Sequence, residues 1–179
     1  MNSLESGLAA GRRHPAARPL TIDIALQSTL WNARRDAKAI LRRALQQASA
    51  AAAVTDGEIS VVLCDDHAMR VLNRDWRGKD APTNVLAFPA DTGKPAAGRT
   101  RLLGDIVIAY ETLEREVRAQ GNPFTEHLAH LAVHGFLHLV GHDHRTPAQA
   151  EQMERFEAAI LAQLDIPNPY LGRIRRAAV

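Results

Sequence analysis

The sequence predicts an α+β fold, a single domain in which helices pack on one small mixed β-sheet. Short apolar stretches with strand-like patterns are interleaved with segments whose apolar residues recur at helical spacing. The 179 residues suffice for one well-buried core and contain no internal repeat. We expect the functional site on a late helix and the turn that follows it, where histidines are concentrated.

The first half of the chain predicts two strands and two helices. Leu20 to Leu26 alternates apolar with polar or small residues, the period of a half-buried strand. Apolar residues between Ala33 and Leu45 recur at helical spacing, and Glu58 to Cys64 is a second apolar strand. Asp65 or Asp66 can cap the next helix. That helix has three evident apolar positions: Met69, Leu72 and Trp76.

The second half continues the same alternation. The predicted elements are a short strand from Val85 to Phe88, a hairpin or loop from Asp91 to Thr100, a buried strand from Leu102 to Tyr110, and a helix from Glu111 to Gln120. Pro123 then lies near the start of the histidine-rich helix, and Pro147 opens a last helix. The apolar face of this last helix is formed by Met153, Phe156, Ile160 and Leu164.

Composition and the chain ends indicate the limits of the domain and the cellular compartment. Residues 19–166 are expected to form the domain, 1–18 a disordered basic extension and 167–179 a basic tail. Cys64 is the one cysteine, which excludes an internal disulfide and fits a reducing compartment. Neither a secretory signal nor a run of about twenty apolar residues is present. These features predict a cytoplasmic protein that has no membrane partner.

Six of the eight histidines lie between His127 and His144. His134 and His138 are four residues apart, so they share one face of a helix and can bind the same ion. Gly141 is a natural place for that helix to end, after which the chain can turn back and bring His144 to the same point. Three protein ligands leave a fourth tetrahedral position open, as in catalytic zinc sites. We prefer this interpretation to one of hydrogen-bonded core histidines.

Neighbouring residues limit the chemistry of such a site. Zinc peptidases of this spacing carry a glutamate as general base directly after the first histidine, where this chain has Gly135. Asp143 can either orient an imidazole or cap the turn. We expect His127 and His130 to be packed or solvated, and His142 to point to solvent.

Basic residues form two further candidate sites. Arg74, Arg77 and Lys79 cluster around Gly78 and could hold the phosphates of a substrate, although an exposed basic turn would look the same. The helix after Ala33 carries a basic face that is either solvated or in contact with an RNA backbone. Its members are Arg34, Arg35, Lys38, Arg42 and Arg43.

Three segments resemble, in the right order, the motifs of the YbeY family of bacterial endoribonucleases, the rRNA maturation factors of the UPF0054 type. They are RGKDAPTNVLAFP within Asn73 to Pro89, Leu103 to Ile106, and HGFLHLVGHDH from His134 to His144. The resemblance spans residues 20 to 164. Two residues depart from the family pattern, His142 in place of a usual tyrosine and Ala87 in place of a common serine.

The resemblance implies a single-strand-specific, zinc-dependent endoribonuclease that acts in 16S rRNA 3′-end maturation and ribosome quality control. It implies that His134, His138 and His144 bind one Zn²⁺ ion, and that Arg77 contacts the RNA and supports catalysis together with His134. The implied partners are single-stranded RNA, the 16S rRNA precursor, the small ribosomal subunit and its assembly factors. The general base stays open: a metal-bound hydroxide would serve if a 2′-hydroxyl is the nucleophile, and Asp105 or Asp143 could assist, although a structural cap is the better interpretation of each.

Two other functions remain as alternatives. One is a non-catalytic ribosome-assembly or RNA-binding factor in which zinc only holds the fold. The other is a zinc-dependent peptide or amide hydrolase, which the histidine spacing favours and Gly135 opposes.

Overall fold

The computed structural model describes residues 20–90 and 100–171. The predicted N-terminal extension at 1–18, nearly all of the predicted loop at 91–100 and the end of the predicted tail lie outside the described residues. Within the described ranges, no helix combines the length and the apolar character that a membrane crossing requires.

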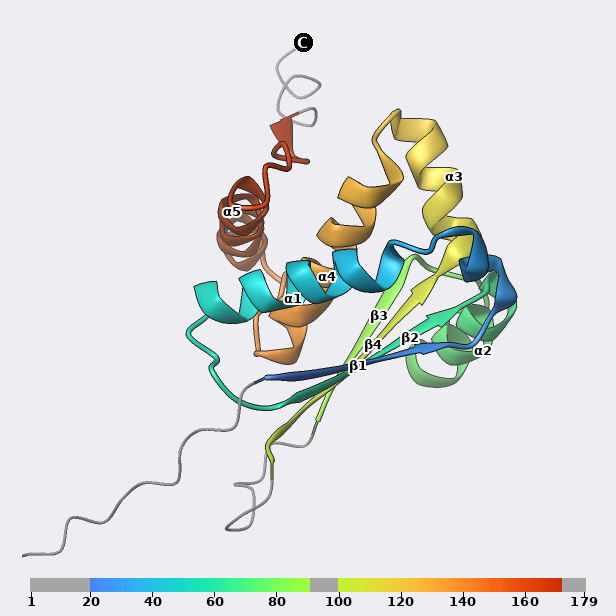
Figure 1. Cartoon of the computed structure of the whole chain (residues 1–179), viewed down its shortest axis with the longest axis horizontal. Helices are drawn as coiled ribbons and strands as arrows, with labels where there is room; N and C mark the ends of the chain where they lie inside the picture. Colours follow the sequence, from blue (N-terminus) through green and yellow to red (C-terminus); the bar gives the residue numbers. More distant parts are fainter. Residues whose placement is uncertain (1–19, 91–99, 172–179) are drawn as a thin grey trace, which may run out of the picture.

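A four-stranded mixed sheet forms the centre of the domain (Figure 1). Its strands, in spatial order, are β1 (Thr21–Leu26), β2 (Glu58–Cys64), β4 (Leu102–Ala109) and β3 (Val85–Pro89). The first three are mutually parallel, whereas β3 runs antiparallel to β4 and forms one edge. The predicted α+β fold with a small mixed sheet is therefore confirmed.

Gly104 allows β3 and β4 to approach each other closely. Its φ of +135° is a backbone conformation that side chains rarely adopt. A Cβ atom at this position would lie 2.2 Å from the carbonyl oxygen of Phe88, which no small adjustment could relieve. The glycine of the third motif is thus required by the pairing of the edge strand.

The helices cover the two faces of the sheet unequally. They are α1 (Ala37–Ala51), α2 (Asp66–Arg77), α3 (Tyr110–Gln120), α4 (Phe124–Leu139) and α5 (Pro147–Ala162), and a 3-10 helix, η1 (Thr29–Ala33), precedes α1. Helices α1 and α4 pack on one face and form the larger core with α5, whereas α2 alone covers the other face (Figure 1). Successive residues of β4 divide between the two faces, since Ile106 belongs to the larger core and Val107 to the smaller one.

Helix boundaries differ from the predictions at two places. The segment after Leu26 first forms η1, so α1 begins only at Ala37, and Tyr110 opens α3 rather than ending β4. Trp76 continues the apolar stripe of α2 but is exposed, because the described structure provides only Phe88 of the edge strand as an aromatic neighbour for its ring. Trp76 therefore continues the apolar positions of the helix, as the sequence indicates, without being buried.

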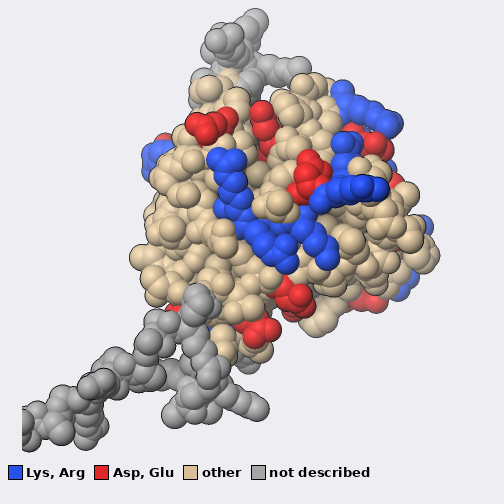
Figure 2. Space-filling model, in the orientation of Figure 1, with Lys and Arg blue, Asp and Glu red and all other residues tan. Residues whose placement is uncertain are grey.

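Basic side chains gather on the face that Figure 2 shows, over α1 and the turn before it. Arg35, Arg42 and Arg43 are exposed. Arg34 is half-buried instead, with its guanidinium carbon 4.0 Å from the centre of the Phe124 ring. This arginine therefore has a packing role that the sequence pattern did not indicate.

We predict that the thiol of Cys64 is inert in the native protein. The residue is fully buried, and burial together with the nearby carboxylate of Asp65 raises the pKa of the thiol to about 12. A thiol reagent at mildly alkaline pH should leave the native chain unmodified and label one thiol per chain in denaturant. Rapid labelling of the native protein would contradict the burial of β2.

Candidate metal centre

Three histidines converge at the C-terminal end of α4. His134 and His138 lie on one face of the helix, and each offers a ring nitrogen that lies within 4.8 Å of a ring nitrogen of His144. The helix ends in a Schellman motif, in which Gly141 adopts a φ of +93° and the His142 N–H donates to the Leu137 carbonyl. This reversal carries His144 back toward the helix, as the position of the glycine predicted.

Hydrogen bonds fix the orientation of both helical imidazoles. Nδ1 of His134 lies 2.6 Å from Oε1 of Glu157 on α5, and Nδ1 of His138 lies 3.0 Å from the carbonyl oxygen of His142. A carboxylate and a carbonyl can only accept, so each Nδ1 must carry the proton and donate it. In the neutral form of each ring, Nε2 then carries a lone pair that can bind a cation.

The spacing of these lone pairs fits a cation. Nε2 of His134 and Nε2 of His138 lie 3.1 Å apart. Two nitrogen ligands of a tetrahedral zinc ion, each about 2.0–2.1 Å from the metal, are separated by about 3.3–3.4 Å. Two unprotonated nitrogens facing each other so closely repel, and a cation between them removes that repulsion. The donor set therefore fits zinc or a similar imidazole-binding ion.

The electrostatic surroundings keep the groups in the forms that a metal needs. Burial, reinforced by the neighbouring His134 and His144, lowers the pKa of His138 to about 4. Burial alone would raise the pKa of Glu157, but hydrogen bonds from His130 and His134 lower it to about 2. Near neutral pH, His138 is thus a neutral ligand, and Glu157 is an ionised acceptor for the His134 ring.

Glu157 is the functional residue that the sequence analysis missed. It is completely buried, and its second oxygen accepts a hydrogen bond from the Tyr170 hydroxyl and lies 3.5 Å from Nε2 of His130. The sequence did indicate that Glu157 is buried. The residue lies four positions after Met153 and three before Ile160, within the apolar stripe of the last helix. A carboxylate at such a position needs a buried partner.

Asp143 caps the turn and does not orient an imidazole. Its Oδ1 accepts from the backbone N–H of His144, and its Oδ2 lies 2.6 Å from Nε of Arg145. His142 is only partly exposed, with its ring centre 5.4 Å from that of Phe156, so the expectation that it points to solvent was wrong.

The remaining histidines of α4 extend the polar face of the helix. His127 is buried and lies 2.7 Å from Oε2 of Glu116, which also accepts from the side chain of Asn84. Burial alone would raise the pKa of Glu116, but these hydrogen bonds hold that pKa below its usual value. His130 lies 3.2 Å from the Tyr170 hydroxyl. Both histidines are packed, one of the two states expected for them.

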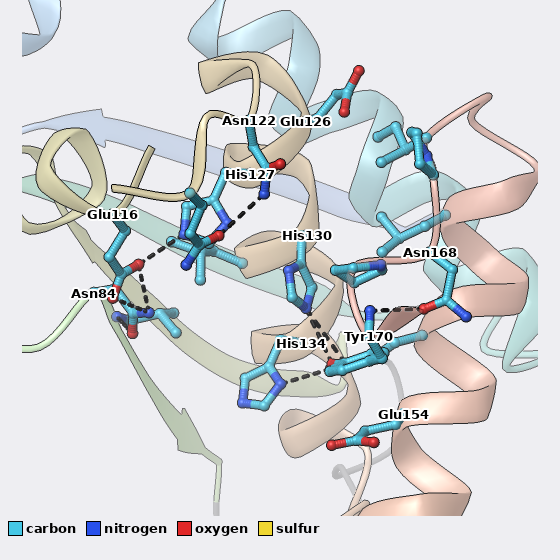
Figure 3. Close-up of a pocket in the computed structure, with 18 of the residues that line it drawn as sticks. Asn84, Glu116, Asn122, Glu126, His127, His130, His134, Glu154, Asn168 and Tyr170 are labelled. Atoms are coloured by element: carbon cyan, nitrogen blue, oxygen red, sulfur yellow. Dashed lines mark hydrogen bonds and ion pairs between the residues drawn. The ribbon is translucent and has the colours of Figure 1, made fainter. Parts of the chain in front are cut away.

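A chamber of about 900 Å³ opens beside the metal centre. In Figure 3, His127, His130 and His134 point into it from α4, Asn84 and Glu116 lie on one side, and Asn168 and Tyr170 lie on the other. Two of the three converging histidines, His134 and His144, line it. Its described lining contains four glutamates and neither lysine nor arginine: Glu116, Glu126, Glu154 and Glu157. The predicted tail contributes to this chamber through residues 167–170.

Gly135 faces the sheet rather than the converging histidines. A Cβ atom on this residue would lie 3.0–3.3 Å from three carbon atoms of the Ile106 side chain on β4. The position that carries the catalytic glutamate in zinc peptidases is therefore a close packing contact in this fold. This arrangement opposes the peptide-hydrolase alternative independently of the missing carboxylate.

Arg77 and Asp105 are not part of the histidine cluster. Arg77 is exposed at the last residue of α2, on the face of the sheet opposite α4. Asp105 alternates with Ile106 along β4 and therefore faces the α2 side as well. Asp105 consequently lies on the wrong face to assist at the metal centre.

Comparisons with known proteins agree with this architecture. A sequence model of the family described as Endoribonuclease YbeY matches residues 24–165. A relative from Rhodopseudomonas palustris strain BisA53, named Endoribonuclease YbeY, is 48% identical over 163 residues, which cover 88% of this chain and 94% of the relative. A relative of the same name from Methylocella silvestris is 50% identical over 153 residues, covering 83% and 85%.

A solved structure shares the fold. The solution structure of a Thermotoga maritima protein is similar with a TM-score of 0.50 and 23% sequence identity, covering 81% of this chain and 92% of that one. The chain belongs to the endoribonuclease YbeY family, as its motifs predicted. Membership assigns it to the hydrolases that cleave RNA.

We predict that Gly135→Glu destabilises the protein and creates no peptidase. The larger side chain must displace Ile106 and bury a carboxylate, which together cost about 3 kcal/mol or more. Urea unfolding measures this loss, and Gly135→Ala, which adds one methyl group, should lose less. A stable Gly135→Glu variant that digests a peptide library would contradict this account of the site.

Proposed function

We propose that this protein is a single-strand-specific endoribonuclease that uses one zinc ion held by His134, His138 and His144. The observation that carries the proposal is the pair of Nε2 atoms 3.1 Å apart whose Nδ1 atoms are both engaged as donors. Family membership supplies the reaction, because the matching family is described as an endoribonuclease.

A zinc ion held by these three histidines would supply a Lewis acid and would lower the pKa of a water molecule bound to it. His134 has two roles in this proposal, as a ligand and as the end of a hydrogen-bond chain from Tyr170 through Glu157. Glu157 holds the ring in the tautomer that directs Nε2 to the metal and raises its basicity. The chain's contribution at the centre is therefore orientation and charge.

Selection of single strands is supported by the chamber beside the centre. A cavity of about 900 Å³ can take an unpaired nucleotide, whereas the bases of a duplex are stacked and paired and would first have to be pulled out. The glutamate-rich lining repels phosphate, so we propose that the base enters and the backbone stays at the rim. Arg77 contacts the backbone and supports cleavage from the neighbouring sheet edge.

The biological setting follows from the family resemblance. We propose that the substrate is the precursor of 16S rRNA at its 3′ end, that the enzyme takes part in ribosome quality control, and that it acts in the cytoplasm with the small subunit and its assembly factors. Residues 19–166 would form the catalytic domain in this proposal, although Tyr170 of the tail reaches Glu157 within it.

We predict that His138→Ala loses zinc and ribonuclease activity together. Removing one ligand from a three-histidine site abolishes the Lewis acid, which contributes several kcal/mol, so cleavage should fall about 1,000-fold or more. The measurement is cleavage of a single-stranded RNA and of its duplex, with metal content determined on the same samples.

Two controls separate this proposal from its alternatives. His67→Ala on α2 removes a histidine outside the cluster and should keep both zinc and activity. Wild type freed of metal by a chelator should stay folded by circular dichroism. Unfolding on chelation together with no cleavage by the zinc-loaded protein would instead favour the non-catalytic assembly factor with a structural zinc.

We predict that Arg77→Glu lowers RNA cleavage by about 100-fold or more and leaves bound zinc unchanged. The substitution replaces a cation that would stabilise phosphate charge with an anion, on a side chain outside the histidine cluster. Arg118→Glu on α3 is the control charge reversal, because Arg118 is an exposed, ion-paired arginine outside this basic segment. Loss of zinc from Arg77→Glu would make Arg77 a structural residue.

A further inference from the structure

Trp76 is the most exposed large apolar side chain in the described part of the chain. It is 70% exposed, whereas Met69 and Asn73, which precede it on the same face of α2, are buried. Exposure of so much indole surface to water is unfavourable, at a position where a shorter polar residue would suffice. The side chain therefore calls for a binding explanation.

The end of α2 holds this indole in place. The ring packs edge-on against Phe88 of β3, with the ring centres 5.5 Å apart. Gly78 ends the helix in a left-handed conformation, and Asn73 donates from its side chain to the carbonyl of Ala81 at 2.7 Å. The exposed tryptophan is thus presented on a braced segment, and little conformational freedom remains to be lost on binding.

Some of the cations around the indole are paired with carboxylates and others are not. Arg70 makes two hydrogen bonds of 2.7 Å to the carboxylate of Asp80, which hold the pKa of that carboxyl below its usual range. Arg74 is likewise paired with Asp75. Among the described residues, no carboxylate lies within ion-pair distance of the two cations that directly flank the exposed end of the helix. These cations are Arg77 and Lys79.

The Phe88–Pro89 end of β3 lies between Trp76 on one face of the sheet and α4 on the other. Phe88 and Pro89 of β3 pair with Asp105 and Gly104 of β4. On the opposite face of the sheet, Leu139 at the end of α4 packs here, since a Cβ atom on Gly104 would lie 3.0 Å from its Cδ2 atom. A strand of nucleic acid could therefore pass from one face to the other around β3.

We propose that Trp76 is a stacking site for one unpaired base of the RNA substrate, with Arg77 and Lys79 binding neighbouring phosphates. Aromatic side chains combined with nearby cations are the means by which proteins hold single strands without reading their sequence. The RNA would run around the β3 edge toward the histidine centre. This site rests on the proposed ribonuclease function and adds a second contact that requires unpaired bases, outside the chamber.

The flanking charges favour RNA over a protein partner. A tryptophan that anchors a protein usually lies in a patch of other apolar side chains, which lose water together. Here the exposed residues next to Trp76 in the chain are charged or glycine, from Arg74 to Asp80. Two of them are cations that lack a carboxylate partner in the described structure, and phosphate supplies the complementary charge.

The two tryptophans of the chain make the proposal measurable by fluorescence. Trp31 is 1% exposed and donates from its indole nitrogen to the Cys64 carbonyl, so it serves as an internal reference that a ligand cannot reach. The probe is a 2′-O-methyl oligoadenylate, titrated into the zinc-loaded protein and compared with the same strand in a duplex. Stacking should quench the Trp76 emission with the single strand and not with the duplex.

Variants locate the effect. Trp31→Phe should keep the quenching and Trp76→Phe should lose it. Trp76→Ala should weaken single-strand binding about ten-fold and raise the KM for cleavage by a similar factor, with kcat within about two-fold and zinc unchanged. Trp76→Phe, which keeps an aromatic face, should lose about three-fold or less. Leu26→Ala is the matched control, since Leu26 is 44% exposed on β1 at the opposite edge of the sheet.

The outcomes distinguish failure of the proposed stacking site from failure of the proposed ribonuclease function. Two results together would overturn the stacking site and leave the ribonuclease function standing. One is equally efficient cleavage of single-stranded RNA by wild type and Trp76→Ala, and the other is a wild-type Trp76 emission that the single strand does not change. Weakening by Leu26→Ala equal to that of Trp76→Ala would overturn it as well. A zinc-loaded wild type that neither binds nor cleaves the RNA would overturn the proposed function, and this site with it.

Discussion

A helix that is buried on most sides can carry polar groups only along one stripe, and only where each group finds a partner. Helix α4 meets this constraint with a row of imidazoles at positions 127, 130, 134 and 138. The other side of the helix packs on the sheet, where Gly135 lies close against Ile106. The orientation of the row, and with it the direction of every imidazole, is therefore set by the packing of the core.

The partners of this row come from separate parts of the chain. Glu116 is supplied by α3, Glu157 by α5, and the His142 carbonyl by the turn after α4. Tyr170, beyond α5, completes the arrangement. The centre thus assembles only when these elements are docked on α4, so its geometry depends on the whole larger core. Substitutions far from the histidines can change the centre without touching a ligand.

Local spacing allowed much of the fold and the histidine cluster to be predicted. Helix periodicity brings His134 and His138 together, and Gly141 marks the reversal that returns His144, because both effects act within a few residues. The role of Glu157 was missed, since it depends on how α5 docks on α4, although a carboxylate within an apolar stripe was a visible sign. The ligand assignment itself stays a prediction.

Trp76 and Asp105 illustrate the same limit on the other face of the sheet. Periodicity indicates which side of a helix or strand a residue occupies, but not where the neighbouring element ends. Trp76 lies on the correct side of α2 and is nevertheless exposed, with Phe88 of the edge strand as its aromatic neighbour. Asp105 follows the glycine of a motif, yet the alternation of β4 turns it away from the histidines.

Strand β3 forms an edge of the sheet, so no neighbouring strand pairs with its outer side within the described structure. Open edges of this kind invite a second chain to add a strand and so promote aggregation. Here the strand has five residues and ends at Pro89, which lacks an N–H group. The basic end of α2 packs beside it through Trp76 and Phe88, so two such edges would repel each other. The positive charge of this segment therefore also disfavours self-association at the edge.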